Sequence, residues 1–321
     1  FIRIDVFVKN GNKVELIEVK AKSFDKEKGS FRNAKGQGDY IDRSWRPYLY
    51  DVAFQTWVTE QAFPHWNVEP YLMMADKTAT ASVDGLNQLF RVKKNEKNRS
   101  AIEITEEITK TRLGESVLVK VPVREYVEMI WNGLDIDPAK KDAEQIKSFF
   151  DRAKEYGDYY ERDERYPINE GLKCKHCEYK NTVETAAKGL KSGYEECWKQ
   201  KFGEDYDFDE PHIFELWDFR HSQKALDRGI HFLKDLVYED LFTKEPGLPE
   251  TGMSRTDRQW MQVEKRIGRD MEEEHINPEL YDEMDSWTFP LHFIDFETST
   301  VAIPFTAGRR PYEQTAFQFS C

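Results

Sequence analysis

Apolar and polar residues alternate at the start of the chain and predict a β-hairpin. The alternation runs from Ile2 to Val8, Asn10-Gly11 supplies a turn, and residues 14–21 return as a second strand. Side chains two positions apart in a strand point to the same face of a sheet. Any functional pair spaced in this way on the second strand is therefore held on one rigid surface.

The apolar spacing then changes to the period of a helix. From Tyr48 to Phe63 the apolar residues fall on one side of a predicted helix, which Pro64 ends. Residues 68–74 again have the pattern of a strand. The order strand, strand, helix, strand predicts an α/β fold.

The remaining pattern is weaker, and it predicts mainly helices. Residues 22–46 and 244–253 are expected to be loops, and residues 76–115 are polar, with one short helix over 84–90. Strands are predicted over 116–123 and 290–298. Helices are predicted over residues 125–131, 138–156, 215–236 and 258–274.

Three residues of the first hairpin form a candidate catalytic group. Glu18 and Lys20 share one face of the second strand, and Asp5 on the first strand can reach the same end. Two carboxylates suit a divalent metal that lowers the pKa of a water, and an ammonium can orient that water or stabilise phosphate charge. The alternative is a solvated face of a surface hairpin.

Charge is distributed unevenly over the 321 residues, whose net charge is −13. A negative total argues against a nucleic-acid partner, because phosphate contacts need Lys and Arg. Residues 1–50, however, hold 11 Lys and Arg against 7 Asp and Glu, a balance of +4, which leaves −17 for the remainder. Either the loop after the hairpin is a solvated charged segment, or it grips a nucleic-acid backbone through Lys22, Arg32, Lys35, Arg43 and Arg46.

The hairpin resembles a known nuclease signature. Asp5 in I-R-I-D-V-F and Glu18 to Lys20 in I-E-V-K are similar to the D…(D/E)-x-K motif of PD-(D/E)xK nucleases, in their RecB-like branch. The resemblance implies a restriction-endonuclease-like mixed sheet with flanking helices. It also implies a Mg²⁺- or Mn²⁺-dependent deoxyribonuclease in which Asp5, Glu18 and the backbone carbonyl of Val19 hold the metal and Lys20 positions the water.

The helix after the hairpin matches this family in part. RecB-like nucleases carry a Gln there, usually followed by a Tyr four residues later, and this Gln assists catalysis. Gln55 fits the first position, but Thr59 occupies the second. Gln55 is therefore predicted either as a site residue or as an ordinary residue of the helix surface.

A cysteine group lies in the middle of the chain. Cys174 and Cys177 form a C-x-x-C knuckle, Cys197 follows, and this use of cysteine indicates metal binding in a reducing cytoplasm. The resemblance implies that the three thiolates bind a [4Fe-4S] cluster. A structural zinc with His176 or His212 as fourth ligand is the alternative, and buried thiols without a metal are a third interpretation.

The last predicted strand carries a second acidic motif. Asp295 and Glu297 end an apolar stretch and resemble the first motif of DnaQ-like DEDD exonucleases, in which such carboxylates bind two metal ions. Two solvated acids at a strand end are the alternative. The remaining acids of that family would lie after Cys321, and because the sequence opens in mid-strand without Met, we expect a fragment.

Together these patterns predict a DNA nuclease of composite architecture, resembling a bacterial family that joins a RecB-like nuclease, a cysteine knuckle and a DnaQ-like domain. An inactive nucleic-acid-binding or scaffolding protein with a zinc knuckle is the alternative function. The patterns do not choose between DNA and RNA, and no stretch is apolar enough to span a membrane. The expected segments are a nuclease core over 1–160, the knuckle over 161–205, an acidic helical region over 206–285 and the first strands of an RNase H-like domain over 286–321.

Overall fold

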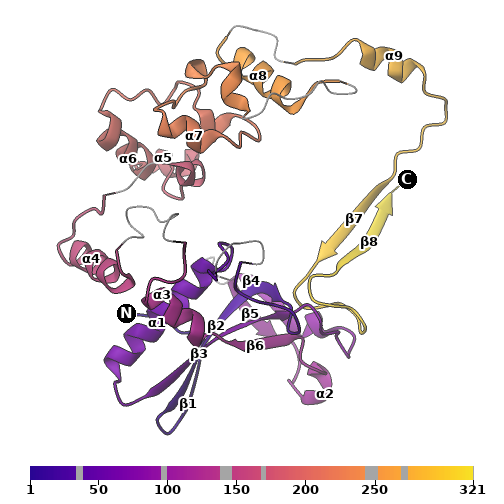
Figure 1. Ribbon diagram of the computed structural model, residues 1–321. Coiled ribbons are helices and arrows are strands. Elements are labelled where there is room, and N and C mark those ends of the chain that lie inside the picture. Colours follow the sequence, from indigo (N-terminus) through magenta and orange to yellow (C-terminus); the bar gives the residue numbers. More distant parts are fainter. Residues whose placement is uncertain are drawn as a thin grey trace. The chain divides into compact units, whose positions relative to one another are not determined.

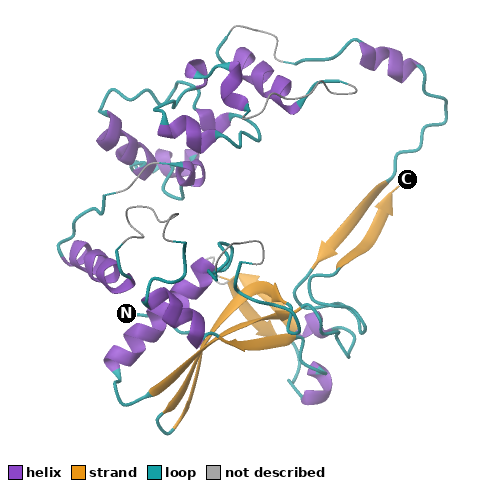
Figure 2. Cartoon of the chain, viewed as in Figure 1, coloured by secondary structure: helices purple, strands orange, loops and turns teal. Residues whose placement is uncertain are grey.

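The chain forms two compact units, which are described separately. One consists of residues 1–164 together with 290–321, and the other of residues 165–289 (Figure 1). Every strand of the described residues belongs to the first unit, and the second is built from short helices and loops (Figure 2). The computed structural model describes residues 1–33, 39–94, 100–137, 147–167, 171–242, 252–268 and 274–320.

A mixed four-stranded sheet with the order β1-β2-β3-β6 is the centre of the first unit. Strand β1 pairs antiparallel with β2, β2 runs parallel to β3, and β3 pairs antiparallel with β6. Helix α1 connects the two parallel strands, as a parallel connection requires. The bounds of these elements are β1 Val6–Asn10, β2 Lys13–Phe24, α1 Arg46–Ala62, β3 Asn67–Asp76 and β6 Leu118–Pro122.

The core of this unit lies between the sheet and two helices, α1 and α3 (Arg124–Trp131) (Figure 1). Helix α1 can start at Arg46 because Pro47 stands in its first turn, where a backbone N–H has no partner within the helix. Its apolar face contributes Leu49 and Val52, both fully buried. Burying a side chain of this size is worth about 1.5–3 kcal/mol. This packing holds α1 against β2 and so determines which α1 side chains face that strand.

Two hairpins complete the first unit. One consists of β4 and β5, and the other of β7 and β8. The loop between β7 and β8 is fixed to the unit by backbone hydrogen bonds in both directions between Ala81 and residues 308 and 309, each about 2.8–2.9 Å long. The remaining bounds are η1 Leu86–Leu89, β4 Phe90–Lys94, β5 Ser100–Ile104, α2 Lys110–Leu113, α4 Phe149–Glu161, β7 Asp295–Thr300 and β8 Gln314–Ser320.

The second unit has its own core, in which Ile213, Leu216 and Leu233 are fully buried. Its helices are short. Gly229, which follows α7, has a φ of +78° and so does not continue the helix. The bounds are η3 Leu172–His176, α5 Val183–Ala187, α6 Gly193–Phe202, η4 Ile213–Glu215, α7 Ser222–Asp227, η5 Leu233–Asp235, η6 Tyr238–Leu241, α8 Arg255–Arg266 and α9 Glu279–Asp285.

Several predicted elements agree with this architecture. The α/β class, the order strand, strand, helix, strand, and the positions of β3, β6 and α3 are confirmed. Helix α8 begins three residues before its predicted start and ends at Arg266. Helix α4 covers the second half of the helix expected over 138–156 and continues to Glu161. Residues 138–146 and 269–273, which belong to these two predictions, lie outside the described residues.

Other predicted elements are wrong in extent or kind. Strand β1 starts only at Val6, and its turn is centred on Gly11 and Asn12, because Asn10 still pairs with Lys13. The helix expected over 215–236 is divided into η4, α7 and η5. The polar stretch after residue 76 contains the β4–β5 hairpin, and the helix expected over 84–90 shrinks to the single turn η1.

No helix among the described residues has the length and apolar character to cross a membrane. The cytoplasmic location inferred from the cysteines stays a prediction.

Candidate active site

Strand β2 and helix α1 bring four polar side chains together. Glu18 and Lys20 point from β2 toward α1, on the face that also buries Leu16 and Phe24. Asp51 and Gln55 lie one helical turn apart on α1, so their side chains share one side of the helix. Packing of the apolar face of α1 on β2 therefore places two helix side chains directly over two strand side chains.

These four residues, here called the Lys20 network, form a closed ring of hydrogen bonds. Lys20 Nζ donates to Glu18 Oε1 at 2.5 Å and to Asp51 Oδ2 at 2.8 Å. Gln55 Nε2 donates to Glu18 Oε2 at 2.8 Å and to Asp51 Oδ1 at 3.0 Å. Each carboxylate is thus held at one oxygen by the ammonium and at the other by the amide.

The carboxylate of Asp5 is bonded to strand β2 at Val19, the residue between Glu18 and Lys20. The regular pairing of β1 with β2 ends at Val6 opposite Ile17. Beyond this point the Val19 N–H donates to Asp5 Oδ2 at 2.9 Å, so a side-chain carboxylate replaces a backbone acceptor. The prediction that Asp5 reaches the Glu18 end of the hairpin is consistent with this bond. Val19, predicted as a carbonyl ligand, contacts Asp5 through its N–H.

Strand β2 leaves its regular pairing with β3 directly after Val19. From Val19 to Ser23 the partner strand advances only from Met73 to Ala75, so β2 contains an irregularity of the bulge type. Bulges change the direction of a strand and of its side chains, and they are frequent beside active sites. Lys20 and Lys22 belong to this irregular segment, which therefore sets their direction.

The electrostatics of the network follow from burial and pairing. Burial raises the pKa of Glu18, a residue 6% exposed, and hydrogen bonds from Lys20 and Gln55 offset this only in part. Burial acts against the ammonium of Lys20, but bonds to Asp51 and Glu18 outweigh it and raise the pKa of Lys20. Burial is outweighed at Asp51 too, where bonds from Lys20 and Gln55 lower the pKa. The ion pair of Lys20 with Asp51 is thereby favoured.

The donor atoms at this end of β2 fit a hard divalent cation. Mg²⁺ is commonly held by one or two carboxylates and completes its shell with waters. Asp5 and Glu18 supply two carboxylates, and Gln55 Oε1 is a buried oxygen without a hydrogen-bond partner. Across the described residues, no group of three or more His, Cys, Asp or Glu side chains is placed to hold a metal. Asp5 and Glu18 therefore stay a predicted pair of ligands.

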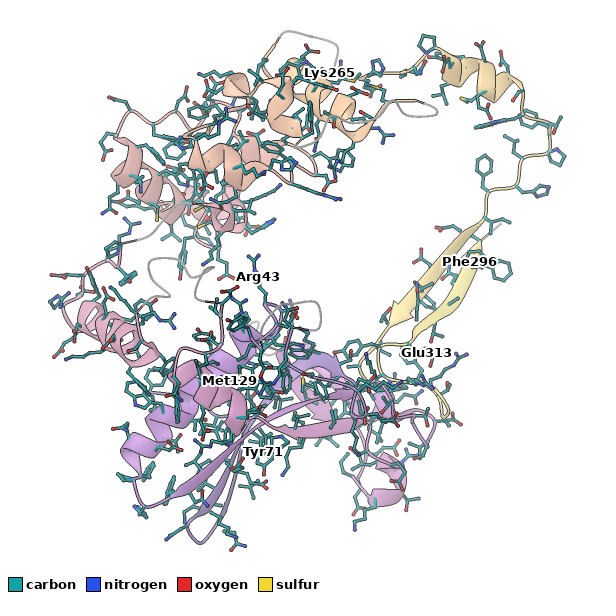
Figure 3. All side chains as sticks on the ribbon, viewed as in Figure 1. Arg43, Tyr71, Met129, Lys265, Phe296 and Glu313 are labelled. Atoms are coloured by element: carbon teal, nitrogen blue, oxygen red, sulfur yellow. The ribbon has the colours of Figure 1, made fainter. Side chains whose placement is uncertain are left out.

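The basic residues predicted to contact a nucleic acid have different surroundings. Lys22 Nζ lies 3.8 Å from the centre of the Trp45 ring and donates to the Ser44 carbonyl. Arg32 forms ion pairs with Asp39 and Glu125. The guanidinium of Arg46 donates to the Ile41 carbonyl, whereas Arg43 is exposed and extends from the loop before α1 (Figure 3). Lys35 lies outside the described residues.

Arg32 is therefore neutralised by two carboxylates. Arg43, exposed, and Lys22, stacked on an aromatic ring beside the Lys20 network, keep a charge that phosphate can use.

The three cysteines of the second unit are half-buried and carry no disulfide. Cys174 and Cys177 share one turn, in which the Cys177 N–H donates to the Cys174 carbonyl at 3.2 Å. Cys197 lies on α6, where its Sγ accepts a hydrogen bond from Arg165 at 3.2 Å. Within the described ranges no group of three or more His, Cys, Asp or Glu side chains is placed to hold a metal, and the iron-sulfur and zinc interpretations of these cysteines stay predictions.

The two histidines considered as zinc ligands differ sharply. His176 is exposed in the knuckle. His212 packs in a cluster of aromatic rings, 5.0 Å from the ring centre of the fully buried Trp198, and its Nδ1 accepts the Phe214 N–H. Burial, with a smaller effect of His231 and Lys180, lowers the pKa of His212 to about 4. His212 is consequently neutral at pH 7, with a buried Nε2 that has no hydrogen-bond partner.

Asp295 and Glu297 lie on β7, where both are exposed. The strand begins at Asp295, so residues 290–294, which are apolar except for His292, precede it, contrary to the prediction of a strand that ends in the acidic pair. Asp295 Oδ1 accepts a hydrogen bond from the N–H of the neighbouring Phe296 at 2.9 Å. The same hairpin carries two exposed apolar side chains, Phe296 and Phe319. Figure 3 labels Phe296 on this strand pair.

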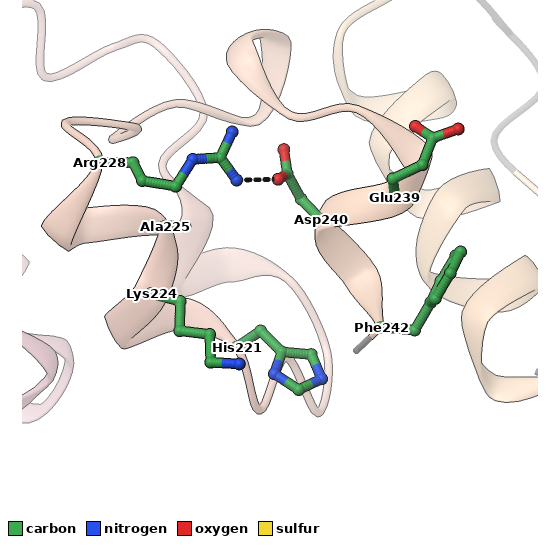
Figure 4. Close-up of a pocket in the computed structure, with 7 residues that line it drawn as sticks. All are labelled: His221, Lys224, Ala225, Arg228, Glu239, Asp240 and Phe242. Atoms are coloured by element: carbon green, nitrogen blue, oxygen red, sulfur yellow. Dashed lines mark hydrogen bonds and ion pairs between the residues drawn. The ribbon is translucent and has the colours of Figure 1, made fainter. Parts of the chain in front are cut away.

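A small pocket of about 100 Å³ opens in the second unit (Figure 4). Arg228 and Asp240 form an ion pair across it, and Lys224 and Glu239 add one charge of each sign. Burial, followed by the charges of Lys224 and Arg255, lowers the pKa of His221, which also lines it. The opposed charges give this pocket no preference for an anion or a cation, and it contains none of the residues predicted from the sequence.

Comparison with known proteins gives one match. Residues 292–321, which include β7 and β8, match a family described as a domain of unknown function (DUF2779). No curated protein and no solved structure matches the chain. Asp295 and Glu297 fall inside the matched segment, whereas the Lys20 network lies outside it.

Sequence reasoning overlooked Asp51 and the aromatic residues Trp45 and Tyr48. Asp51 was detectable, because it lies four residues before Gln55 and therefore on the same side of the predicted helix. The two rings lie next to Lys22, whose Nζ is 5.0 Å from the centre of Tyr48. Lone aromatic residues at the start of a helix are usually core residues, so no pattern indicated this contact.

Proposed function

We propose that this chain is a metal-dependent nuclease that hydrolyses phosphodiester bonds of DNA, at a site formed by Asp5, Glu18, Lys20 and Gln55. The observation that carries the proposal is the Lys20 network, which holds an ammonium between two carboxylates beside the carboxylate of Asp5. The mixed sheet and the crossover helix support a restriction-endonuclease-like fold for this unit.

Asp5 and Glu18 would hold a Mg²⁺ or Mn²⁺ ion, with the Val19 carbonyl as a further ligand. When bound, such an ion stabilises negative charge on phosphate and increases the acidity of a water. Lys20 binds a phosphate oxygen or orients the attacking water through its ammonium. Gln55 holds one Glu18 oxygen and thereby fixes the direction of the other.

Lys22 and Arg43 would contact the nucleic-acid backbone near this site. Such contacts position the substrate without reading its sequence. The [4Fe-4S] or zinc centre predicted for Cys174, Cys177 and Cys197 would have a structural role and enters no step of this reaction. Asp295 and Glu297 are likewise given no role in this reaction.

One observation favours a second candidate, an inactive nucleic-acid-binding or scaffolding protein. In the Lys20 network every carboxylate oxygen of Glu18 and Asp51 already accepts a hydrogen bond, so the ring is complete without a metal. In this second case Lys20 has a structural role. Binding to DNA would then be independent of metal and would weaken steeply with salt.

The test is cleavage of fluorescent single- and double-stranded DNA by the 321-residue chain in Mg²⁺, in Mn²⁺ and in EDTA. We expect cleavage only with a metal, and its loss in Asp5→Ala and in Lys20→Ala. Lys120→Ala is the matched control, since Lys120 forms a comparable ion pair with Glu15 at 2.8 Å away from the site. Full cleavage by Lys20→Ala would contradict the proposal, and metal-independent binding without cleavage would support the second candidate.

A further inference from the structure

Asp51 is the residue that ties Lys20 to helix α1. Its Oδ2 accepts from Lys20 at 2.8 Å and its Oδ1 accepts from Gln55 at 3.0 Å, so both oxygens are in use. Glu18, the other acceptor of Lys20, lies on the same strand as the lysine, only two residues away. Asp51 therefore provides the one bond of this ammonium, among those in the Lys20 network, that links the strand to a second element.

This link matters because Lys20 is flexible and lies on an irregular strand segment. A lysine ammonium sits on a four-carbon stem with many rotamers, and β2 leaves its regular pairing immediately before it. The Lys20 side chain is 20% exposed and that of Asp51 is 42% exposed, so both remain accessible at the surface of the site. A second anchor is needed to fix the ammonium in one place.

Glu18 and Asp51, the two acceptors of Lys20, differ in whether they stay free to bind the ammonium in the proposed reaction. A cation held by Glu18 competes with Lys20 for the same carboxylate, since Glu18 Oε1 is the atom that accepts from the ammonium. Asp51 approaches from α1 and is restrained by Gln55. The bond of Asp51 to Lys20 does not involve the Glu18 oxygen that a cation would take.

We propose that Asp51 is a positioning residue that holds the Lys20 ammonium in its working place when Glu18 binds the metal. The inference rests on the proposed nuclease function and deepens it. Asp51 acts through Lys20 and contacts neither the metal nor the substrate.

This role predicts a specific kinetic signature. Misplacing a reacting group by about 1 Å can cost on the order of 100-fold in rate. We expect Asp51→Asn to lower kcat by about 10- to 100-fold, with an unchanged KM for DNA and an unchanged Mn²⁺ concentration for half-maximal rate. Asp51→Glu, which keeps a carboxylate, should recover a large part of kcat.

Glu15→Gln is the matched control, because it removes the carboxylate partner of Lys120 from the same strand at the same 2.8 Å distance. This variant should retain the wild-type kcat. Asp51→Ser replaces Asp51→Asn if the latter does not give the cooperative urea unfolding of the wild type. An unchanged kcat in the Asp51 variants would overturn the inference, and so would a raised Mn²⁺ requirement, which would make Asp51 a metal ligand.

A measurement without catalysis tests the contact itself. Urea unfolding in EDTA of Asp51→Asn, Lys20→Gln and the double variant forms a thermodynamic cycle. We expect the changes in the free energy of unfolding of the two single variants not to add up to the change in the double variant. Additive changes would overturn the inference. Absence of metal-dependent cleavage by the wild type would instead contradict the proposed function, whereas wild-type cleavage with an unaffected Asp51→Asn would overturn only the role of Asp51.

Discussion

Two acidic motifs of the first unit, Glu18 on β2 and the pair Asp295 and Glu297 on β7, look equally suited to metal binding in the sequence. In the structure Glu18 is 6% exposed and accepts hydrogen bonds from Lys20 and Gln55. Asp295 and Glu297 are exposed on a two-stranded hairpin. The comparison shows that the surroundings of a carboxylate, more than its motif, distinguish the two regions.

The physical reason lies in the elements that pack on each strand. Helix α1 covers β2 and brings Asp51 and Gln55 to Glu18, whereas β7 pairs only with β8 among the described strands. A partly dry, hydrogen-bonded carboxylate interacts more strongly with nearby charges than an exposed one, because the local dielectric is lower. Chemistry that depends on charge is therefore expected at β2.

The sharpest test of this comparison exchanges one carboxylate for an amide on each strand. Glu18→Gln should reduce the metal-dependent cleavage rate by about 1,000-fold or more, because a ligand and a preorganised charge are lost together. Glu297→Gln should cleave at the wild-type rate. Both rates are measured on the same fluorescent DNA, and an equal loss in the two variants would show that β7 contributes to the reaction.

A second test compares the two regions through stability. Gln55→Leu leaves the buried Glu18 without its amide donor and should lower the free energy of unfolding by about 2–3 kcal/mol. In the hairpin, Gln314 donates to Thr298 at 2.9 Å on the exposed surface. Gln314→Leu should change the free energy of unfolding by less than about 0.5 kcal/mol.

Urea unfolding of the full chain measures both values. A loss in Gln55→Leu no larger than that in Gln314→Leu would mean that the Lys20 network does not stabilise the first unit.

The sequence predicted the strand part of the site better than its helix part. Alternation and turn residues located the hairpin, although β1 is shorter than its apolar pattern because Asp5 takes over the bond to the Val19 N–H. Gln55 followed from a resemblance, and Thr59, found at the position of the usual Tyr, donates to the Gln55 carbonyl within the helix. Asp51 was not predicted because the nuclease motif lies on β2, whereas Asp51 belongs to the face of α1 that packs over this strand.

Elsewhere tertiary packing overrode the local pattern. Residues 215–236 have helical spacing, but Gly229 adopts a φ of +78° and His212 forms a β-bridge with Phe232, so the segment folds back instead of extending. The β4–β5 hairpin was missed because it lies in a stretch that is polar as a whole, and its apolar residues Val92, Ile102 and Ile104 are exposed. In both segments the conformation depends on contacts that are distant in sequence.

The smallest expected effect concerns the acid titration of Asp51 and of Glu313, a half-buried carboxylate between β7 and β8. Burial opposes ionisation of Asp51, but bonds from Lys20 and Gln55 outweigh it, so its pKa lies below the usual 3.8. A carboxyl group with a lowered pKa in the folded state stabilises the fold above its unfolded pKa and loses this contribution as the pH falls through its folded pKa. Removing the charge of Asp51 should therefore lower the stability of the fold at neutral pH and leave it unchanged in acid.

Asp51→Asn should lower the free energy of unfolding by about 0.5–1 kcal/mol at pH 7, a value limited by the exposure of the Asp51 side chain. Measured in EDTA at successively lower pH, the difference from the wild type should shrink once the pH falls below 3.8. The backbone N–H of Arg310, with the side chain of Arg309, lowers the pKa of Glu313 too, but solvent screens this group. Glu313→Gln should leave the unfolding midpoint unchanged, and a pH-independent effect of Asp51→Asn would show that its carboxylate charge does not stabilise the fold.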